Sequence, residues 1–68
     1  MTFIIESTLS RRWPYVAWCH HGKIIGKAND INTWLGNNNI EHLHEVDVTH
    51  RWYLKSRQDL EWLLLKWG

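Results

Sequence analysis

SRQDLEWLLLKWG, residues Ser56–Gly68, is the segment that decides most of the predicted fold. Ser56 and Asp59 form an S-x-x-D pattern, in which the serine side chain accepts a hydrogen bond from a backbone N–H of the first helical turn. One helix face then carries apolar residues at the i, i+3, i+4, i+7 spacing, namely Leu60, Leu63, Leu64 and Trp67. We therefore expect a helix that begins at Arg57 and lays this stripe on a sheet.

Two apolar residues of the same segment do not fit the stripe. On a helical wheel Trp62 and Leu65 lie on the far side, so either a second surface covers them or the last residues leave the helix as a short strand. An apolar helix that is buried on two sides indicates a partner. Because tryptophan and arginine are enriched at binding hot spots, we assign Trp62 and Leu65 to a protein-binding surface with Arg57 at its rim.

Strands are predicted on both sides of the middle of the chain. Residues Thr2–Ser7 and His50–Ser56 are rich in β-branched, aromatic and apolar residues. Ile31–Leu35 precedes a turn cluster and is read as a strand, with a short helix capped by Asp30 as the competitor. Residues Ile40–Val48 alternate between two faces, and they form either an extra strand or an irregular excursion.

The segment Ser10–Gly22 supports two readings. As a helix it has Ser10 at the N-cap, Pro14 in the first turn and Gly22 as a C-terminal stop. As a strand it has one side lined by Trp13, Tyr15, Ala17 and Cys19, followed by a turn. The positions of the cap, the proline and the glycine favour the helix.

Length and composition indicate one small domain, residues 1–68. A chain of 68 residues is close to the lower limit for a hydrophobic core without disulfides or metal. It contains six tryptophans, and each can bury about 150–250 Å². We therefore expect tryptophan to take the place of core size.

Cysteine content, charge and hydropathy restrict location and partners. Cys19 is the only cysteine, which excludes an intramolecular disulfide and fits a reducing cytosol. The first residues lack the charged leader of a secretory signal and no apolar run reaches about 18 residues, so we expect neither secretion nor a membrane partner. A net charge of +1 provides no strong field towards nucleic acid or membranes.

Histidine and cysteine residues make a metal site one alternative. His42 and His44 would project from the same strand face, and Cys19 with His20 would add a thiolate and an imidazole, which are zinc ligands. The spacing matches no recognised zinc finger, and a closed site needs four converging ligands. Ordinary surface or interface histidines and a small buried thiol explain the pattern better than a metal site does, so we expect no cofactor.

Basic residues next to aromatic ones make nucleic acid another alternative. Arg11, Arg12, Arg51 and Lys55 stand near tryptophans and tyrosines, and bases stack on exposed aromatic rings beside a basic groove. Acidic residues balance these charges, whereas nucleic-acid-binding domains are usually clearly basic. Single-stranded or non-specific nucleic-acid binding therefore ranks below protein binding.

The end of the chain resembles that of small uncharacterised proteins of tailed bacteriophages. In those proteins an aromatic strand leads through an arginine and an aspartate to a helix that ends Leu-x-Trp-Gly. The corresponding residues here are Arg57, Asp59, Leu63, Leu65, Trp67 and Gly68, and a mid-chain pair before a glycine is matched by Trp18, Cys19 and Gly22. The resemblance covers about half of the chain and departs from it at residues 36–50. It implies a compact β-α-β-β-α unit of phage origin with no defined chemistry.

These elements predict an α+β domain with a small antiparallel sheet of three or four strands. The expected order is β-α-β-β-α, with one extra strand left open, and two helices pack on one face of the sheet. We expect a non-catalytic phage accessory protein in the cytoplasm of the infected bacterial host. It would bind and modulate a host or phage protein, or bind a second copy of itself. No paired carboxylates, phosphate loop or nucleophile motif indicates an enzyme.

Overall fold

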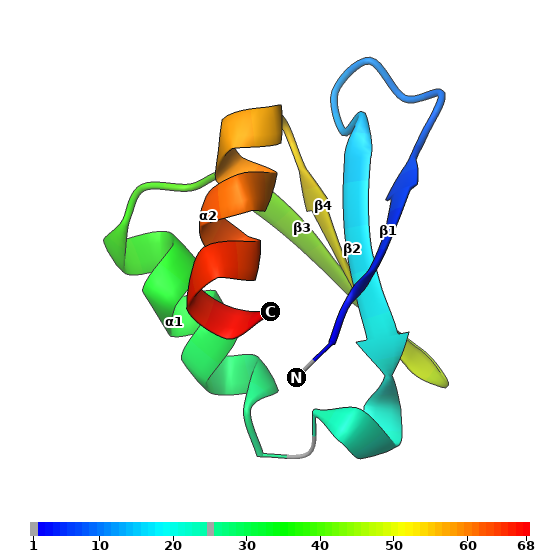
Figure 1. Cartoon of the computed structure of the whole chain (residues 1–68), viewed down its shortest axis with the longest axis vertical. Coiled ribbons are helices and arrows are strands. Elements are labelled where there is room, and N and C mark those ends of the chain that lie inside the picture. The colour runs from blue at the N-terminus through cyan, green and yellow to red at the C-terminus, as the bar shows by residue number, and fades with distance from the viewer. Residues whose placement is uncertain (1, 25) are drawn as a thin grey trace.

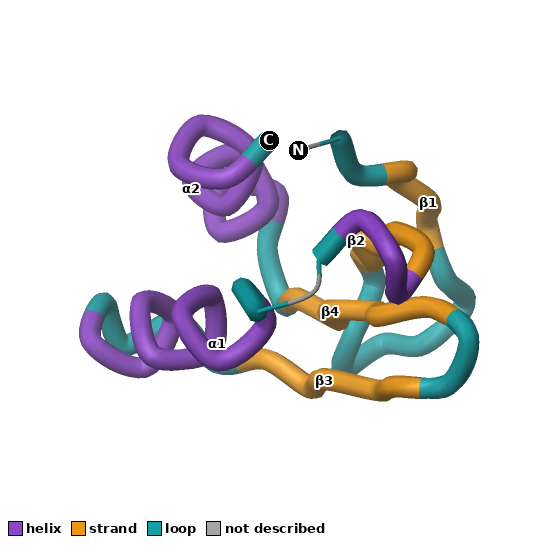
Figure 2. The backbone as a smooth tube through the Cα atoms, turned by 90° about the horizontal axis from the view of Figure 1, so that it is seen from below, coloured by secondary structure: helices purple, strands orange, loops and turns teal. Residues whose placement is uncertain are grey.

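Four antiparallel strands form one sheet, and two helices cover one of its faces (Figure 1). The protein is represented by a computed structural model that describes residues 2–24 and 26–68. The strands lie in the order β1-β2-β4-β3, and the view in Figure 2 shows both helices on the same side of the sheet. In chain order the elements are β1 Ile4–Ser7, β2 Tyr15–His20, the short 3-10 helix η1 His21–Lys23, α1 Ala28–Asn37, β3 His42–Val46, β4 Thr49–Leu54 and α2 Arg57–Trp67. The predicted α+β class, with an antiparallel sheet and two helices on one face, is confirmed.

The helix at Ser10–Gly22 is wrong, because its second half forms β2 in the middle of the sheet. Ser10 does accept a hydrogen bond from the backbone N–H of Trp13, at 3.0 Å, as a helix cap would. Pro14 disfavours helical backbone at the residue before it, so the turn ends at Trp13 and the chain continues extended. The strand reading is confirmed, and the residues of β2 that face the helices are Tyr15, Ala17 and Cys19.

The strand at Ile31–Leu35 is wrong as well, because these residues lie inside α1. Ala28, Ile31 and Leu35 recur at helical spacing and pack on the core. This packing stabilises the helix although many of its residues have low helix propensity. The alternative prediction of a short helix in this segment is confirmed. Asp30 lies in its first turn, where a carboxylate favours the helix dipole, rather than at the cap.

α1 ends in the predicted turn cluster. Asn39 has a φ of 57°, in the left-handed region that asparagine tolerates better than most residues. The backbone N–H of Ile40 donates to the carbonyl of Leu35 at 2.9 Å, and that of Asn39 donates to Gly36 at 3.1 Å. These two bonds make a Schellman motif, which stops the helix and turns the chain towards β3.

The closing strand and helix confirm the sequence prediction closely. β4 alternates between buried and half-buried residues, and β3 is the extra strand that the alternation at Ile40–Val48 allowed. Ser56 Oγ accepts from the backbone N–H of Asp59 at 3.1 Å, and α2 begins at the next residue after the serine. Leu60 and Leu63 of its inner stripe are buried.

The core lies between the sheet and the helices, and it contains a single fully buried tryptophan. Its buried members are Phe3, Ala17, Cys19, Ile24, Ile31, Leu35, Ile40, Trp52, Leu54, Leu60 and Leu63. Of the six tryptophans, all of them described, only Trp52 is fully buried, whereas Trp34 and Trp67 pack at the margin of the core. The expectation that tryptophan replaces core size is therefore too strong, because aliphatic residues make most of the core.

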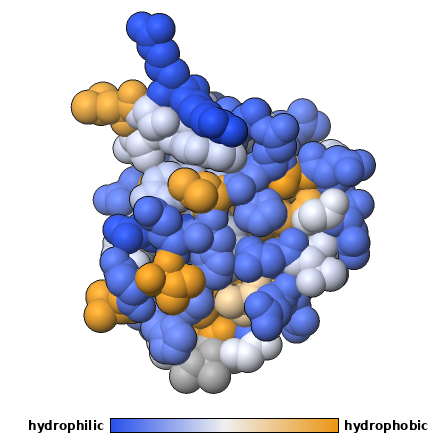
Figure 3. Space-filling view, turned by 180° about the vertical axis from the view of Figure 1, so that it is seen from behind, coloured by the Kyte–Doolittle hydropathy of each residue, from blue (hydrophilic) through white to orange (hydrophobic). Residues whose placement is uncertain are grey.

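Apolar side chains on the surface form separate islands on the face shown in Figure 3. The large exposed ones are Ile4, Ile5, Leu9, Leu43, Val46, Val48, Trp62 and Leu65. None of the described helices has the length and hydropathy to cross a membrane.

Candidate functional site

A shallow hollow opens between the outer surfaces of the two helices. It has a volume of about 290 Å³ and is lined by Trp34 from α1 and by Trp62, Leu65 and Lys66 from α2. We refer to these four residues as the α1–α2 hollow. Trp62 is 46% exposed and Leu65 is 88% exposed, so both predicted docking residues lie at the surface of the isolated chain.

The core contacts of the two helices position the hollow. Burial of Leu60 and Leu63 fixes the rotation of α2, and at 100° per residue this rotation turns Trp62 and Leu65 outwards. In α1, burial of Ile31 and Leu35 leaves Trp34 half-buried at the side that faces α2. The hollow is therefore a consequence of how both helices pack on the sheet.

Lys66 is the charged residue of the hollow. Its Nζ lies 5.7 Å from the centre of the Trp67 ring, and among the described residues no carboxylate forms an ion pair with it. Arg57, predicted at the rim, does not line the hollow. It pairs with Glu61 one turn along α2, with 3.4 Å between Arg57 Nε and Glu61 Oε1.

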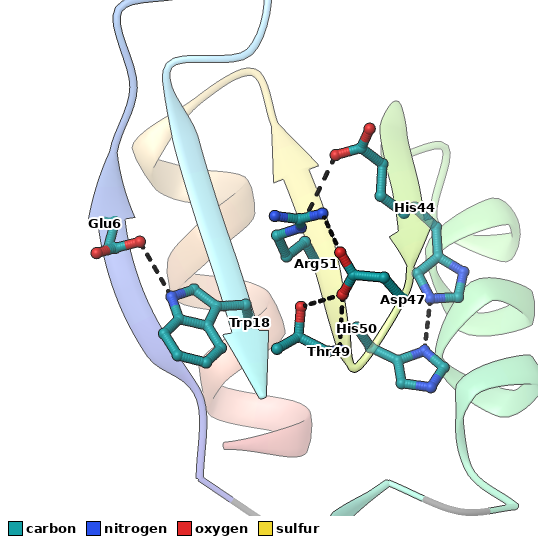
Figure 4. A network of polar contacts seen from close by, with 8 residues as sticks. Glu6, Trp18, His44, Asp47, Thr49, His50 and Arg51 are labelled. Atoms are coloured by element: carbon teal, nitrogen blue, oxygen red, sulfur yellow. Dashed lines mark hydrogen bonds and ion pairs between the residues drawn. The ribbon is translucent and has the colours of Figure 1, made fainter. Parts of the chain in front are cut away.

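A second polar feature, the His–Trp network, lies on the helix-covered face of the sheet. The indole N–H of Trp52 donates to Oδ1 of Asn32 at 2.7 Å, and Nδ2 of Asn32 lies 3.1 Å from Nδ1 of His44. Nε2 of His44 lies 2.9 Å from Nδ1 of His50, and Nε2 of His50 lies 2.8 Å from Nδ1 of His21. Figure 4 shows the contact between His44 and His50. These five residues join α1, β3, β4 and η1.

Hydrogen-bond chemistry fixes the direction of the whole His–Trp network. Because the indole N–H of Trp52 can only donate, Asn32 has to turn its oxygen to Trp52 and its amide nitrogen to His44. Nδ1 of His44 then accepts, so the neutral ring carries its proton on Nε2 and donates to His50. His50 donates to His21 in the same sense. One extra proton on any of the three rings brings two N–H donors face to face.

Burial adds to this preference for neutral rings. It lowers the pKa of His44, and the nearby rings of His50 and His42 lower it further. Burial also lowers the pKa of His50, with a smaller contribution from His21. The rings are stacked as well, and His44 lies 4.3 Å above Trp52 with 4° between their planes. The His–Trp network therefore holds α1, β3, β4 and η1 together when its histidines are neutral.

The four predicted metal ligands do not form one site. Cys19 and His20 are successive residues of β2, so their side chains lie on opposite faces of the sheet. Cys19 faces the helices next to His50, together with His42 and His44 of β3. Within residues 2–24 and 26–68, no three His, Cys, Asp or Glu side chains are close enough to hold a metal. Burial also raises the pKa of the Cys19 thiol, which opposes the thiolate form.

The predicted nucleic-acid residues are divided between two places. The guanidinium of Arg12 lies 5.5 Å from the centre of the Trp13 ring, and Nζ of Lys55 lies 5.9 Å from it. Arg11 precedes Arg12 in the same exposed loop. Lys55 forms an ion pair with Glu41, and this contact lowers the pKa of the Glu41 carboxyl. The cluster around Trp13 is therefore basic but partly neutralised.

Arg51 lies apart from that cluster, on the face of the sheet that the helices leave uncovered. It pairs with Asp47 at 2.9 Å and lies 3.9 Å from Glu45. On the same face Glu6 accepts a hydrogen bond from the indole N–H of Trp18 at 3.1 Å (Figure 4). These carboxylates oppose the approach of a phosphate backbone.

Sequence reasoning missed Trp34 and most of the His–Trp network. Trp34 was hidden because its segment was assigned to a strand. Alternation along β4 places His50 and Trp52 on one face, and this pattern was visible in the sequence. The role of Asn32 was not visible, because it depends on α1 and on contacts between residues 12 to 20 positions apart in sequence.

Comparisons with known protein families, with curated proteins and with solved structures find no match to this chain.

Proposed function

We propose that this protein is a non-catalytic binding module whose α1–α2 hollow takes an apolar side chain of a protein partner. The observation that supports the proposal is the exposure of Trp62 and Leu65 beside that hollow. Leu60 and Leu63 of the same helix are buried, so α2 satisfies its packing on the sheet without using its outer face. Exposed tryptophan and leucine beside a concavity are typical of interaction sites.

The charge of the hollow adds to the proposed partner chemistry. Lys66 forms no ion pair with a described carboxylate, so an incoming acidic side chain would gain a contact that the isolated chain does not supply. The proposed ligand is therefore a protein surface that presents a large apolar side chain next to a carboxylate.

The cellular setting is part of the proposal. The resemblance of residues 51–68 to the ending of small phage proteins supports an accessory role in the cytoplasm of an infected bacterium. There the partner would be a host protein, a phage protein or a second copy of this chain. The His–Trp network does not compete with this proposal, because its polar groups bond to one another and hold the fold together.

Photo-cross-linking in bacterial cells tests the proposed function. A photoreactive amino acid is introduced at position 65, and a matched control carries it at position 48, where Val48 is 79% exposed but lies in the β3–β4 turn. We expect protein adducts from position 65 that are absent from position 48 and that disappear when Trp62→Gln is added. Identical adducts from both positions, or none from position 65, would refute the proposal.

A second candidate function has one observation in its favour, the presence of Arg12 and Lys55 at the ring of Trp13. Aromatic rings beside basic side chains bind single-stranded nucleic acids by stacking and charge. If this surface acts in that way, a labelled single-stranded oligonucleotide binds at low salt and Trp13→Ala weakens it. Binding that is unchanged in Trp13→Ala, or absent at low salt, removes this candidate.

A further inference from the structure

The His–Trp network cannot take up an extra proton and keep all of its contacts. Each of its four contacts, which run from Trp52 through Asn32, His44 and His50 to His21, has one donor and one acceptor when the rings are neutral. Because the indole N–H of Trp52 can only donate, rotating the Asn32 amide or exchanging ring tautomers moves a mismatch along the chain and never removes it. His21 is exposed, so protons from solvent reach the chain at this end.

The surroundings of the three rings do not offset an added positive charge. Among the described residues no carboxylate forms an ion pair with any of them. On β3, the ring of His42 lowers the pKa of His44. On β2, Cys19 is the cross-strand neighbour of His50, and burial raises the pKa of its thiol, so it supplies no negative charge in acid. On η1, Lys23 lies close enough to Cys19 to act on that thiol as a further positive charge.

The sheet fixes three of the five members of the network. His44 lies on β3 and both His50 and Trp52 lie on β4, and these two strands are paired with His44 opposite Trp52 (Figure 4). The other two members, His21 and Asn32, lie on η1 and α1, which follow one another along the chain. A pair of facing donors is therefore relieved by moving η1 and α1 away from the sheet, because separating them otherwise requires breaking the β3–β4 pairing.

Movement of α1 changes the α1–α2 hollow. Trp34, the α1 side of the hollow, lies two residues after Asn32 in the same helix. α2 takes no part in the network, and its serine cap and buried leucines hold it on the sheet independently of the histidines. When the Asn32 contacts are lost, Trp34 shifts relative to Trp62 and Leu65, and the hollow no longer has both of its sides.

We propose that the His–Trp network is a pH-sensitive switch, which holds α1 on the sheet while its rings are neutral and releases α1, and with it one side of the α1–α2 hollow, in acid. This inference rests on the proposed binding function and adds its regulation. The folded chain lowers the pKa of His44 and of His50, so α1 is held above about pH 6.5, the ordinary histidine pKa, and is released as the pH falls below it.

Hydrogen exchange of the purified full chain tests the switch, with NMR used to follow single amides at about pH 7 and about pH 5. Each rate is divided by that of an unstructured peptide at the same pH. We expect the protection of the Trp34 and Leu35 amides to fall at least about tenfold in acid, since each ring that takes a proton contributes up to about tenfold per pH unit. At about pH 5 it should also lie at least about tenfold below that of Leu63 and Leu64 in α2.

Asn32→Asp supplies the acceptor that the protonated network lacks. Its carboxylate accepts from the indole N–H of Trp52 and from a protonated His44 ring at once. The acid-induced loss of α1 protection should therefore shrink to less than about threefold, or reverse. Asn29→Asp makes the same chemical change at an exposed position of α1 and is the matched control, which should keep the full loss.

Three results would overturn the switch. One is equal protection of α1 at the two pH values, and another is equal protection of α1 and α2 in acid, which would mean that the chain opens only as a whole. The third is an acid-induced loss in Asn32→Asp as large as in Asn29→Asp. The exchange measurement needs no partner, so these failures leave the binding function to the cross-links from position 65. Absence of those cross-links refutes binding and leaves the release of α1 unaffected.

Discussion

The two helices lie on the same face of one sheet, but different interactions hold them there. α1 has no side-chain cap at its N-terminus, and asparagine, threonine and glycine make up half of its ten residues. It is tied to β3 and β4 by Asn32, which contacts both His44 and Trp52. α2 has a serine cap and packs on the sheet through buried leucines.

This difference separates a helix built by tertiary contacts from one built by local signals. α1 depends on a polar network that requires neutral histidines, so its position responds to pH and to changes in the core. α2 needs only its cap and its inner stripe, and its outer face is left for residues without a structural role. The exposed Trp62 and Leu65 are on the helix that can carry them at the smallest cost to folding.

Trp52→Ala removes the side chain that anchors α1 most strongly to the sheet. It removes a fully buried ring and leaves Asn32 and His44 without their partner, so we expect a loss of about 4 kcal/mol in the free energy of unfolding, measured by urea titration. Trp52→Phe retains much of the packing but not the N–H, and should lose less. Equal losses in the two variants would show that the hydrogen bond, and not the packing, dominates at this position.

Acid tests the network with no mutation. The pKa values of His44 and His50 are lowered in the folded protein, so their contribution to stability is complete above about pH 6.5, the ordinary histidine pKa, and is lost as the pH falls below it. Each histidine adds at most about 1.4 kcal/mol per pH unit to this loss. Urea midpoints measured between about pH 5 and 7.5 should fall steadily with acid. A flat profile over that range would contradict the neutral network.

Besides its own three rings, one described titratable group acts on the network, because the ring of His42 lowers the pKa of His44. The lowered pKa values of Asp47 and Glu41 affect stability only below about pH 5, at the acid end of the urea series. His20→Gln is a suitable control, because His20 is exposed and lies outside the network.

Ser56→Ala weakens the local signal of α2. The serine side chain satisfies the backbone N–H of Asp59, and its loss should lower the free energy of unfolding by about 1 kcal/mol. Ser7→Ala, an exposed residue of the edge strand β1, should have almost no effect in the same thermal or urea measurement. If the two substitutions cost the same, α2 does not depend on its cap.

Gly36→Ala tests whether the low helix propensity of α1 limits its stability. Apart from its chain neighbours and the backbone of α1 itself, no atom lies within 4 Å of the added methyl group, and alanine is a better helix former than glycine, so we expect a gain of about 0.5–1 kcal/mol. Gly26→Ala is the matched control. Its surroundings are equally open, but a φ of 80° strains an alanine there, and stability should fall. A loss at both glycines would mean that α1 is not limited by its own helix propensity.

The sequence predicted the elements that carry their own signals. Ser56, Asp59 and the leucine stripe lie within one helix, so α2 and its outward Trp62 and Leu65 were correctly placed. β2 was misread because Ser10, Pro14 and Gly22 stand where a helix would have them. The restriction that Pro14 imposes on the preceding residue carried more weight than these positions, together with pairing to β1 and β4.

The rest of the site depends on contacts that a single sequence does not display. The His-x-His pattern at His42 and His44 was recognised, but which ring nitrogens meet depends on Asn32 and His21, which lie on other elements. In the same way, the hollow needs Trp34, whose position follows from the packing of α1. The local pattern of α2 predicts that Trp62 and Leu65 are exposed. The α1 side of the hollow, formed by Trp34, follows only from the fold.

If the outer face of α2 serves binding rather than folding, the double variant Trp62→Gln/Leu65→Gln keeps most of the stability of the parent chain. Urea unfolding is measured at about 5 µM, where weak self-association is absent. The structure predicts a free energy of unfolding within about 1 kcal/mol of the parent, because both side chains are exposed in the single chain. A loss of about 3 kcal/mol or more would place them in the core and contradict the claim.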